Sequence, residues 1–233
     1  MSVFCLVHGS TQNASGWDLL AAALGQQPIR VALPTDQPDA SATVYARAIA
    51  DAIPSGVDHA VVVAHSASGM FLPLVPQLRK IGRMVFLAAV IPEPGKSLLE
   101  RIKADSSILN PEWIGKDPTR DDDAARKFLL HDCSPEVTAW AMTTRQLLFA
   151  KGAMIEPCPL AGWPDVPSTY IVCAGDRTIR PEWSRRAARS ILGVEPVELP
   201  GGHCPHVSRP AELARILTGL AKSPCSTLSV PIG

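Results

Sequence analysis

The sequence predicts an α/β fold in which a mostly parallel sheet of about six strands has helices on both faces and a small helical cap. Near-continuous apolar runs alternate with helical segments, which is typical of a parallel sheet covered on both sides. This alternation stops at about residues 92–166 and then resumes, which indicates an insertion. The length of 233 residues suits one domain with a full core. We therefore expect a single domain over 1–233 with a cap at about 92–166.

The strands are expected where apolar and β-branched residues run together. These ranges are 2–8, 29–34, 59–65, 82–90, 168–174 and 195–199. Helices are expected at 16–25, 41–53, 67–79, 181–192 and 210–221. Pro210 supports the start of the last helix because proline fits the first helical turn. Pro73 and Pro76 argue against a regular helix through the whole of 67–79.

The insertion between the fourth and fifth strands is too long to be a simple loop. It contains helical patterns at 97–104, 120–131 and 135–148, separated by prolines. We interpret it as a cap over the C-terminal ends of the strands. The tail from Ser223 to Gly233 is expected to be loose.

Composition argues against several classes of partner. The 22 basic residues balance the 22 acidic ones and no stretch is strongly basic, so neither nucleic acid nor a membrane surface is expected as a partner. The first residues, MSVFCLVHGS, are typical of a strand and not of a signal peptide, and no apolar run could span a bilayer. The six cysteines show no CxxC spacing, which favours free thiols in a reducing cytoplasm. The oligomeric state stays open, with a homodimer as one option.

A strand–turn–helix pattern with a serine at the turn is the strongest functional motif. The apolar run 59–65 ends at Ser66, which is followed by small residues and a helical segment. This pattern is similar to the nucleophile elbow G-x-S-x-G, with Ala64 and Ser68 at the two glycine positions. Small residues are needed there because the strand and the outgoing helix pass close together. The alternative is a buried strand followed by a serine that merely caps a helix.

An elbow serine needs a histidine base and an acid that orients it. The strand 168–174 runs into Asp176, and the strand 195–199 runs into His203. Both residues follow strand ends, in the chain order Ser, Asp, His that this arrangement requires. Taken singly, Asp176 could be a helix-capping turn residue and His203 a loop histidine. The three together point to a catalytic triad.

The same arrangement requires two backbone N–H groups that bind an oxyanion. One should follow the nucleophile, at Ala67, and the other should lie in the loop after the first strand, at Ser10. Gly9 would let that loop approach the reacting oxygen. The alternative for the pair His8-Gly9 is an ordinary strand exit.

The chain resembles the α/β-hydrolase superfamily. Within that superfamily, it resembles the branch that contains plant methylesterases, hydroxynitrile lyases and small bacterial esterases. The segments that carry the resemblance are LVHGSTQNASGW, VVVAHSASGM, HDCSPEVTAW, VPSTYIVCAGDRTIRPEW and PGGHCPHVSRPAEL. The resemblance implies Ser66 as nucleophile, Asp176 as acid and His203 as base, with Ser10 and Ala67 as oxyanion donors.

Three positions separate the esterases of this branch from its lyases. The lyases have threonine after the first-strand histidine, glutamate before the nucleophile and lysine after the catalytic histidine. Here these positions are Gly9, His65 and Cys204, so all three favour an esterase. A cyanohydrin lyase needs a cation near the departing cyanide, which Cys204 cannot provide. A serine elbow also disfavours epoxide hydrolases and haloalkane dehalogenases, whose elbows carry aspartate.

Several other polar residues are given supporting roles. His206 lies three residues after His203 and is the less favoured base, while His8 and His65 flank the site. Asp165 is interpreted as a loop residue, and the acidic run 121–123 as a complement to a helix dipole. Apolar cap residues should pack the cap and partly line an acyl or alcohol pocket. They are Trp113, Trp140, Phe149, Met154 and Trp163.

These features predict hydrolysis of a small carboxylic ester or lactone through an acyl-enzyme, with no cofactor and no metal. The expected partner is a small-molecule ester. One alternative is another activity of the same site, such as thioester or C–C cleavage, weak perhydrolysis or cyanohydrin lysis. Another is a ligand-binding receptor built on a hydrolase scaffold. Turnover of a chromogenic short-chain ester distinguishes the receptor from the enzymes.

Overall fold

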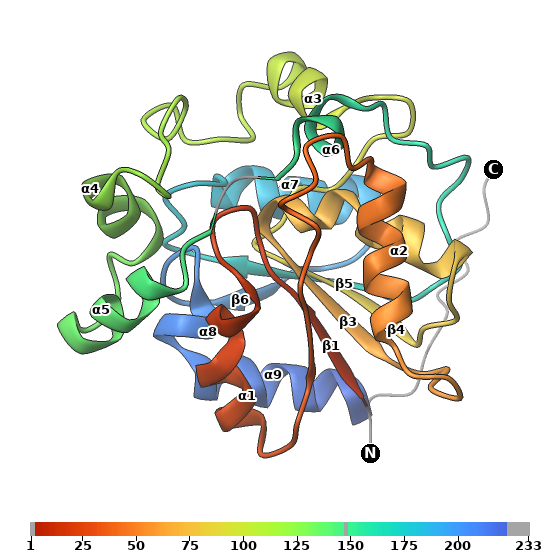
Figure 1. Ribbon diagram of the computed structural model, residues 1–233, viewed down its shortest axis with the longest axis horizontal. Coiled ribbons are helices and arrows are strands. Elements are labelled where there is room, and N and C mark those ends of the chain that lie inside the picture. The colour runs from red at the N-terminus through yellow and green to blue at the C-terminus, as the bar shows by residue number, and fades with distance from the viewer. Residues whose placement is uncertain (1–2, 147–148, 223–233) are drawn as a thin grey trace.

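The computed structural model describes residues 3–146 and 149–222, in which six strands form one fully parallel sheet (Figure 1). The strand order is β2-β1-β3-β4-β5-β6. The predicted fold class is confirmed, and each expected strand is present with shorter bounds. The strands are β1 (Phe4–Val7), β2 (Ile29–Val31), β3 (Val61–His65), β4 (Arg83–Leu87), β5 (Ser168–Cys173) and β6 (Val197–Leu199). The tail 223–233, which was expected to be loose, lies outside the described residues.

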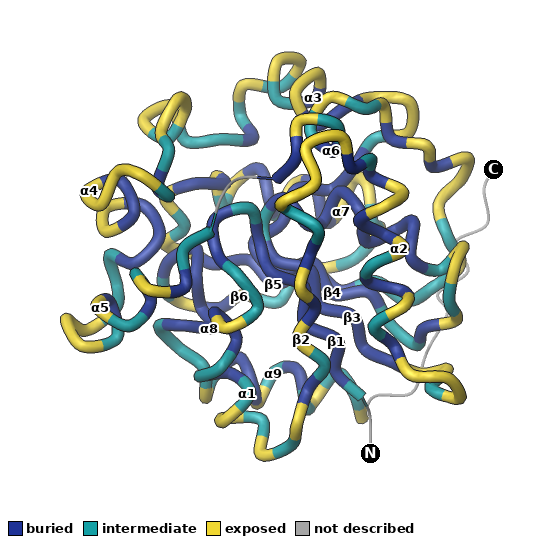
Figure 2. Tube along the Cα trace, in the orientation of Figure 1, coloured by how far each residue is buried: buried dark blue, intermediate teal, exposed yellow. Residues whose placement is uncertain are grey.

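The sheet is buried on both faces because its side chains alternate between two helical layers. Val61 and Val63 of β3 pack in the cluster that contains residues of α1 (Asp18–Leu24) and α9 (Pro210–Lys222). The neighbouring Val62 and Ala64 pack in the cluster that contains residues of α2 (Ala42–Ala52) and α7 (Pro181–Leu192). All of β3 is buried, and the central strands form the dark core of Figure 2. This double burial explains why the strands are continuous apolar runs in the sequence.

The long helices begin at residues whose chemistry suits a helix start. Ser41 precedes α2, and its hydroxyl accepts a hydrogen bond from Val44 N at 3.3 Å. Pro181 and Pro210 are the first residues of α7 and α9, where the missing N–H of proline removes no helical hydrogen bond. The expected helix over 16–25 begins with a 3₁₀ turn, η1 (Ala14–Trp17), and continues as α1.

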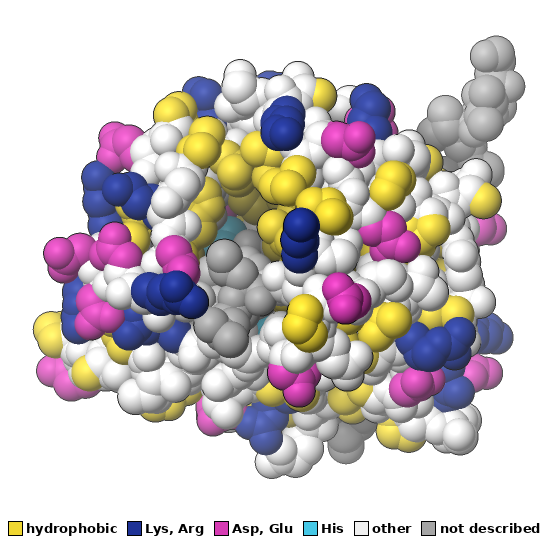
Figure 3. Space-filling view, turned by 45° about the horizontal axis from the view of Figure 1, so that its top comes forward, with side chains coloured by type: hydrophobic (Ala, Val, Ile, Leu, Met, Phe, Trp, Pro, Cys, Tyr) yellow, Lys and Arg dark blue, Asp and Glu magenta, His cyan; other side chains and the backbone are white. Residues whose placement is uncertain are grey.

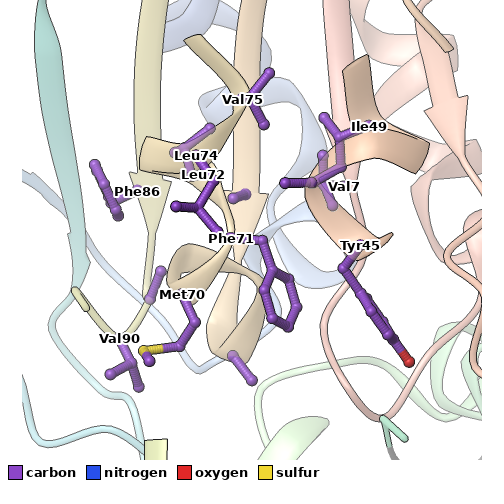
Figure 4. Packing of buried hydrophobic residues seen from close by; sticks show 14 of the residues in the cluster. Val7, Tyr45, Ile49, Met70, Phe71, Leu72, Leu74, Val75, Phe86 and Val90 are labelled. Atoms are coloured by element: carbon purple, nitrogen blue, oxygen red, sulfur yellow. The ribbon is translucent and has the colours of Figure 1, made fainter. Parts of the chain in front are cut away.

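The α-helix expected within 67–79 is absent, and the prolines that argued against a regular helix through this range lie in its second half. The chain forms two 3₁₀ segments there, η2 (Ser66–Met70) and η3 (Leu72–Gln77). Pro76 lies inside η3, where it has no N–H to donate to an α-helical carbonyl. In Figure 4, Met70 lies beside Val90, and the Phe71 ring lies beside that of Tyr45, with ring centroids 4.8 Å apart. Burial of these side chains stabilises a segment that lacks regular α-helical bonding.

Short helices occupy the stretch between β4 and β5. They are α3 (Leu98–Ala104), α4 (Asp122–Ala124), the π-helical η4 (Ala125–Leu129), α5 (Pro135–Thr143) and α6 (Lys151–Ile155). In Figure 1, α3 and α6 lie at the top and α4 and α5 at the left. A further short helix, α8 (Pro205–Ser208), precedes α9. Among the helices of the described residues, none is both long and apolar enough to cross a membrane.

The helix expected at 135–148 ends earlier, at Thr143. Its continuation pairs with the loop after β1, where Asn13 N donates to Thr144 O at 2.8 Å and Gln12 forms an antiparallel bridge with Arg145. Backbone groups bonded to another segment are not free to extend a helix. Residues 147–148 lie outside the described chain.

Candidate active site

The loops that carry the predicted site residues meet at one edge of the sheet. All strands are parallel, so their carboxyl ends lie at the same edge, where α/β proteins bind their ligands. Ser66 follows β3, and Ser10 follows β1, the direct neighbour of β3 in the sheet. Asp176 follows β5 and His203 follows β6. The order of the strands thus brings together residues from four distant parts of the chain.

Ser66 lies at a sharp turn between β3 and η2. Its φ of 58° is in the left-handed region, which a non-glycine residue adopts at an energetic cost. Its carbonyl accepts a hydrogen bond from Val90 N at 3.1 Å, which holds the turn against the segment after β4. This strained turn directs the serine side chain out of the sheet edge.

The turn accommodates the imperfect elbow motif because the backbone passes closest to the neighbouring segment after β4 at Gly69, one residue later than the motif expects. Ser68, at the second glycine position, is fully buried, and its hydroxyl donates to His8 O. At Gly69, in contrast, an added Cβ would collide with the carbonyl oxygen of Val90. Gly69 therefore meets the steric requirement that the motif assigns to position 68.

The three predicted triad residues form one hydrogen-bonded chain. His203 Nε2 lies 2.9 Å from Ser66 Oγ, and His203 Nδ1 lies 2.7 Å from Asp176 Oδ2. The His203 and Asp176 side chains are 3% and 2% exposed. Asp176 accepts through Oδ2, so Nδ1 carries the ring proton and Nε2 is left to accept from the Ser66 hydroxyl. This arrangement has the geometry that a serine–histidine–carboxylate nucleophile requires.

A threonine that the sequence reasoning missed supports this chain. The Thr178 hydroxyl donates to Asp176 Oδ1 at 2.9 Å, and its oxygen lies 2.7 Å from His203 Nδ1. The backbone N–H groups of Thr178 and Ile179 also donate to Asp176 Oδ1, at 2.7 and 3.1 Å. Both carboxylate oxygens of Asp176 are therefore held. A hydroxyl two residues after a turn aspartate is the sequence signal for such a motif.

The two expected oxyanion donors border the same cavity as Ser66 and His203. Ala67 lies in the first turn of η2, where N–H groups have no partner within the helix. Within the described ranges 3–146 and 149–222, neither Ala67 N nor Ser10 N donates a hydrogen bond to another residue. Both groups are thus available to a bound oxygen atom.

His65 and His206 form a buried polar layer behind the triad. His65 Nε2 donates to His203 O at 2.8 Å, and His206 Nε2 donates to Gln12 Oε1 at 2.9 Å. Burial lowers the pKa of His65 well below its ordinary value and lowers that of His206 to about 3, and the neighbouring His203 contributes to both shifts. Both rings are therefore neutral near pH 7. The hydrogen bonds pair His206 with Gln12, and His203 with Ser66.

His8, which directly follows β1, is also buried near the site. His8 Nδ1 donates to Gly9 O at 2.8 Å, and His8 Nε2 accepts from Leu33 N at 3.2 Å. Burial is the main cause that lowers the pKa of His8. The ring therefore fixes the loop that begins at Gly9 and does not contact Ser66 through a hydrogen bond.

Asp132, in the segment between η4 and α5, contacts the loop that carries His203. Its Oδ2 accepts a hydrogen bond from Gly202 N at 2.8 Å, and the Arg209 guanidinium lies 3.9 Å away. Gly202 directly precedes His203, so the Asp132 carboxylate fixes the backbone next to the His203 imidazole. The sequence contains no local signal for this contact, because 70 residues separate its partners.

A cavity of about 150 Å³ opens beside Ser66 and His203. Figure 3 shows a hollow walled by hydrophobic side chains, with histidine visible inside it. Of the apolar cap residues singled out in the sequence, Trp113 and Met154 border the cavity. Phe149 packs in the main core and Trp140 against a smaller cluster, while Trp163 lies near Phe86. Among the described residues, the other apolar side chains that border the cavity are Ala67, Val90, Leu98, Ile102, Leu109, Leu129 and Ile179.

Cys204 directly follows His203 but does not border the cavity. It is fully buried, and its Sγ lies 3.8 Å from Gln12 Oε1. Burial is the main cause that raises the pKa of this thiol well above its ordinary value, so it is neutral near pH 7. Cys5, Cys133, Cys158 and Cys173 are also free thiols, while Cys225 lies outside the described residues.

Among the described residues, no group of three or more His, Cys, Asp or Glu side chains is arranged to hold a metal ion. The chemistry available to the arrangement is that of an activated serine, a histidine base and two free backbone donors.

Comparison with known proteins agrees with this architecture. The alpha/beta hydrolase family matches residues 6–216. The protein named "Probable hydrolase R7" from Phoma sp. is 27% identical over 217 residues, which cover 88% of this chain and 87% of that protein. Polyneuridine aldehyde esterase has a similar structure, with 19% identity, a TM-score of 0.76 and coverage of 95% of this chain and 100% of that one. The methylesterase MES16 from Arabidopsis is 19% identical, with a TM-score of 0.74 and coverage of 94% and 98%. These two structures show a shared fold, and the family match shows more: the chain belongs to the alpha/beta hydrolase family.

Proposed function

We propose that the protein is a serine esterase that hydrolyses a small carboxylic ester or lactone. The observation that carries this proposal is the hydrogen-bonded chain from Ser66 Oγ through His203 to Asp176, at 2.9 and 2.7 Å, beside a cavity. A serine hydroxyl is a weak nucleophile unless an adjacent base accepts its proton, and this geometry provides that base.

In the acylation step, His203 Nε2 accepts the proton of Ser66 while Oγ attacks the ester carbonyl. Asp176 keeps the His203 ring in the tautomer that can accept and stabilises the imidazolium that forms. The imidazolium then gives its proton to the departing alcohol oxygen. Water attacks the acyl-enzyme with the same base, which releases the acid and restores Ser66.

The backbone N–H groups of Ser10 and Ala67 would bind the oxyanion of the tetrahedral intermediate. Each such donor contributes roughly 3–4 kcal/mol to the stabilisation of a transition state in well-studied hydrolases. Their position on the border of the cavity supports this role. Backbone donors need no reorganisation during the reaction because the loop after β1 and the first turn of η2 already hold them.

The size and the lining of the cavity support a small ester as substrate. Its volume of about 150 Å³ is below the roughly 300–1,000 Å³ of sites that bind drug-sized ligands. Its lining is predominantly apolar, which suits the short hydrocarbon parts of an ester. Two similar structures carry the names polyneuridine aldehyde esterase and methylesterase, which also favours ester cleavage over the other activities of such a site.

Cyanohydrin lysis fits this site poorly. In the lyases a lysine directly after the catalytic histidine provides the cation for the departing cyanide, whereas the residue at that position here, Cys204, is a neutral, fully buried thiol turned toward Gln12. A threonine in place of Gly9, as in the lyases, would bring a Cβ to 3.0 Å from Ser66 Cβ, which is closer than side chains ordinarily pack. These observations favour the esterase.

A screen of short-chain nitrophenyl esters, aromatic methyl esters and lactones tests the proposal. We expect turnover of at least one of them by the wild-type protein and a loss of at least about 10³-fold in kcat in Ser66→Ala. Saturable binding of these compounds without turnover would instead favour a ligand-binding receptor. Equal turnover by both proteins would contradict the role of Ser66.

We also propose that the protein acts in the cytoplasm. The five cysteines that the structure describes are free thiols, which suits a reducing compartment. Cell fractionation with an antibody to the protein tests this location, and recovery from the culture medium would contradict it.

A further inference from the structure

One lysine borders the cavity beside Ser66. Lys116 lies in the segment between α3 and α4, next to Trp113, which also borders the cavity. Among the described residues that border this cavity, Lys116 is the one lysine or arginine, and its residue is exposed to solvent. A charged group in a predominantly apolar site is a determinant of what the site binds.

The charge of Lys116 is not neutralised by an ion pair in the described part of the chain. Two acidic residues close to Lys116 in the sequence have other partners. Glu112 accepts a hydrogen bond from Lys127 Nζ at 2.5 Å, and Asp117 lies 3.7 Å from Arg120. The hydrogen bond from Lys127 is the main cause that lowers the pKa of Glu112, and the charges of Lys127, Arg177 and Lys116 contribute to it. The Glu112 carboxylate is thus paired with Lys127 and not with Lys116.

We propose that the substrate is an ester with a second, negatively charged carboxyl group, and that Lys116 binds that carboxylate. This inference rests on the proposed esterase function and specifies its substrate class. The ester carbonyl would lie at Ser66, on the sheet edge, and the carboxylate at Lys116, on the cap side. Apolar side chains such as Leu109 and Leu129 border the same cavity and would contact the short hydrocarbon chain between the two groups.

Lys116 would contribute selectivity and not chemistry. A carboxylate that enters an apolar cavity loses hydration, and the Lys116 ammonium group would offset this loss. A neutral ester of the same shape gains nothing from the ammonium group. The reaction is an ordinary hydrolysis, in which the half-ester and water give a dicarboxylic acid and an alcohol.

A set of esters with matched shapes tests the proposal. Monomethyl succinate, methyl succinamate and methyl 4-methylpentanoate carry carboxylate, amide and isopropyl ends of equal heavy-atom number. Methanol release gives kcat/KM for each compound. We expect the wild type to prefer the ester with the carboxylate end, or its glutarate or adipate homologue, by about tenfold over the methyl ester of the same length with an isopropyl end.

Substitution of Lys116 should remove this preference. In Lys116→Met, we expect the ratio of kcat/KM for the charged ester to that for the isopropyl-ended methyl ester to fall about tenfold, mainly through KM. In Lys116→Arg, the ratio should stay within about threefold of the wild type, because the charge remains. Lys103→Met is the matched control, since Lys103 is an exposed cap lysine that does not border the cavity. It should leave the ratio unchanged.

Two results would overturn the inference while leaving the esterase proposal intact. One is a wild type that prefers the isopropyl-ended methyl esters at every length. The other is a ratio of kcat/KM values in Lys116→Met that stays within twofold of the wild-type ratio. If no ester is hydrolysed, the esterase proposal fails. Calorimetric titration of Ser66→Ala with monomethyl succinate and with methyl 4-methylpentanoate then tests the anion preference. Equal or weaker binding of the charged compound would contradict it.

Discussion

Acidification should destabilise the protein through the buried histidines behind the triad. His206 is 2% exposed, packs against Trp17 with ring centroids 4.3 Å apart, and donates to Gln12 Oε1. Its pKa is lowered from 6.5 to about 3 in the folded protein, mainly by burial and additionally by His203. Between these two values, the unfolded chain binds a proton at this position and the folded protein does not. Stability therefore falls as the pH falls below about 6.5.

The magnitude follows from the difference between the two pKa values. At pH 5, the unfolded-state pKa of 6.5 lies 1.5 units above the solution pH, and each unit corresponds to about 1.4 kcal/mol. His206 should thus reduce the free energy of unfolding by about 2 kcal/mol between pH 7.5 and pH 5. Any folded-state pKa below about 4 gives nearly the same value, because the folded protein is then unprotonated at both pH values. His65, whose pKa is also lowered, acts in the same direction.

Urea unfolding at the two pH values, followed by circular dichroism, measures this effect. His206→Gln cannot be protonated, so its loss of stability on acidification should be about 2 kcal/mol smaller than that of the wild type, whatever its stability at pH 7.5. His59→Gln is the matched control, because His59 is exposed, and it should lose as much as the wild type. Equal losses in wild type and His206→Gln would refute the reasoning.

Three further predictions concern the site. Thr178→Val should lower kcat about fivefold to tenfold, because His203 and its acid lose a hydroxyl partner, while Thr178→Ser should retain activity; steady-state kinetics on one ester measures both. Asp132→Ala should lower the free energy of unfolding by about 1–3 kcal/mol and reduce kcat, because Gly202 N loses its acceptor, whereas the exposed Asp123→Ala should change neither; urea unfolding and kinetics test this pair. Mandelonitrile and acetone cyanohydrin should release no cyanide above the buffer rate, under conditions where an ester is hydrolysed, and enzyme-dependent release that is lost in Ser66→Ala would overturn the esterase proposal.

The sequence predicted the sheet well because its strands are buried on both faces. Such strands are continuous apolar runs, and β3, from Val61 to His65, is buried throughout. The segment after it was harder to predict. Its small and apolar residues fit an α-helix, but the structure has two 3₁₀ segments there. Pro73 and Pro76 both lie in the second one, where they disfavour a regular α-helix.

The positions of the candidate site residues were predictable where each residue follows a strand. Ser66, Asp176 and His203 lie just after apolar runs, and parallel strands bring such positions to one edge. Contacts between distant segments had no comparable signal. Asp132 reaches Gly202 across 70 residues of chain, and Lys116 borders the cavity from an irregular part of the cap.

Covalent labelling of Ser66 tests the central claim most directly. A fluorophosphonate reacts with a serine that an adjacent base activates, and peptide mass spectrometry identifies the modified residue. We predict that the wild type is labelled at Ser66 alone, and that Ser66→Ala and His203→Ala are not labelled at this rate. Labelling of a different residue, or no labelling of a folded wild-type protein that hydrolyses esters, would contradict the assignment of Ser66 as the nucleophile.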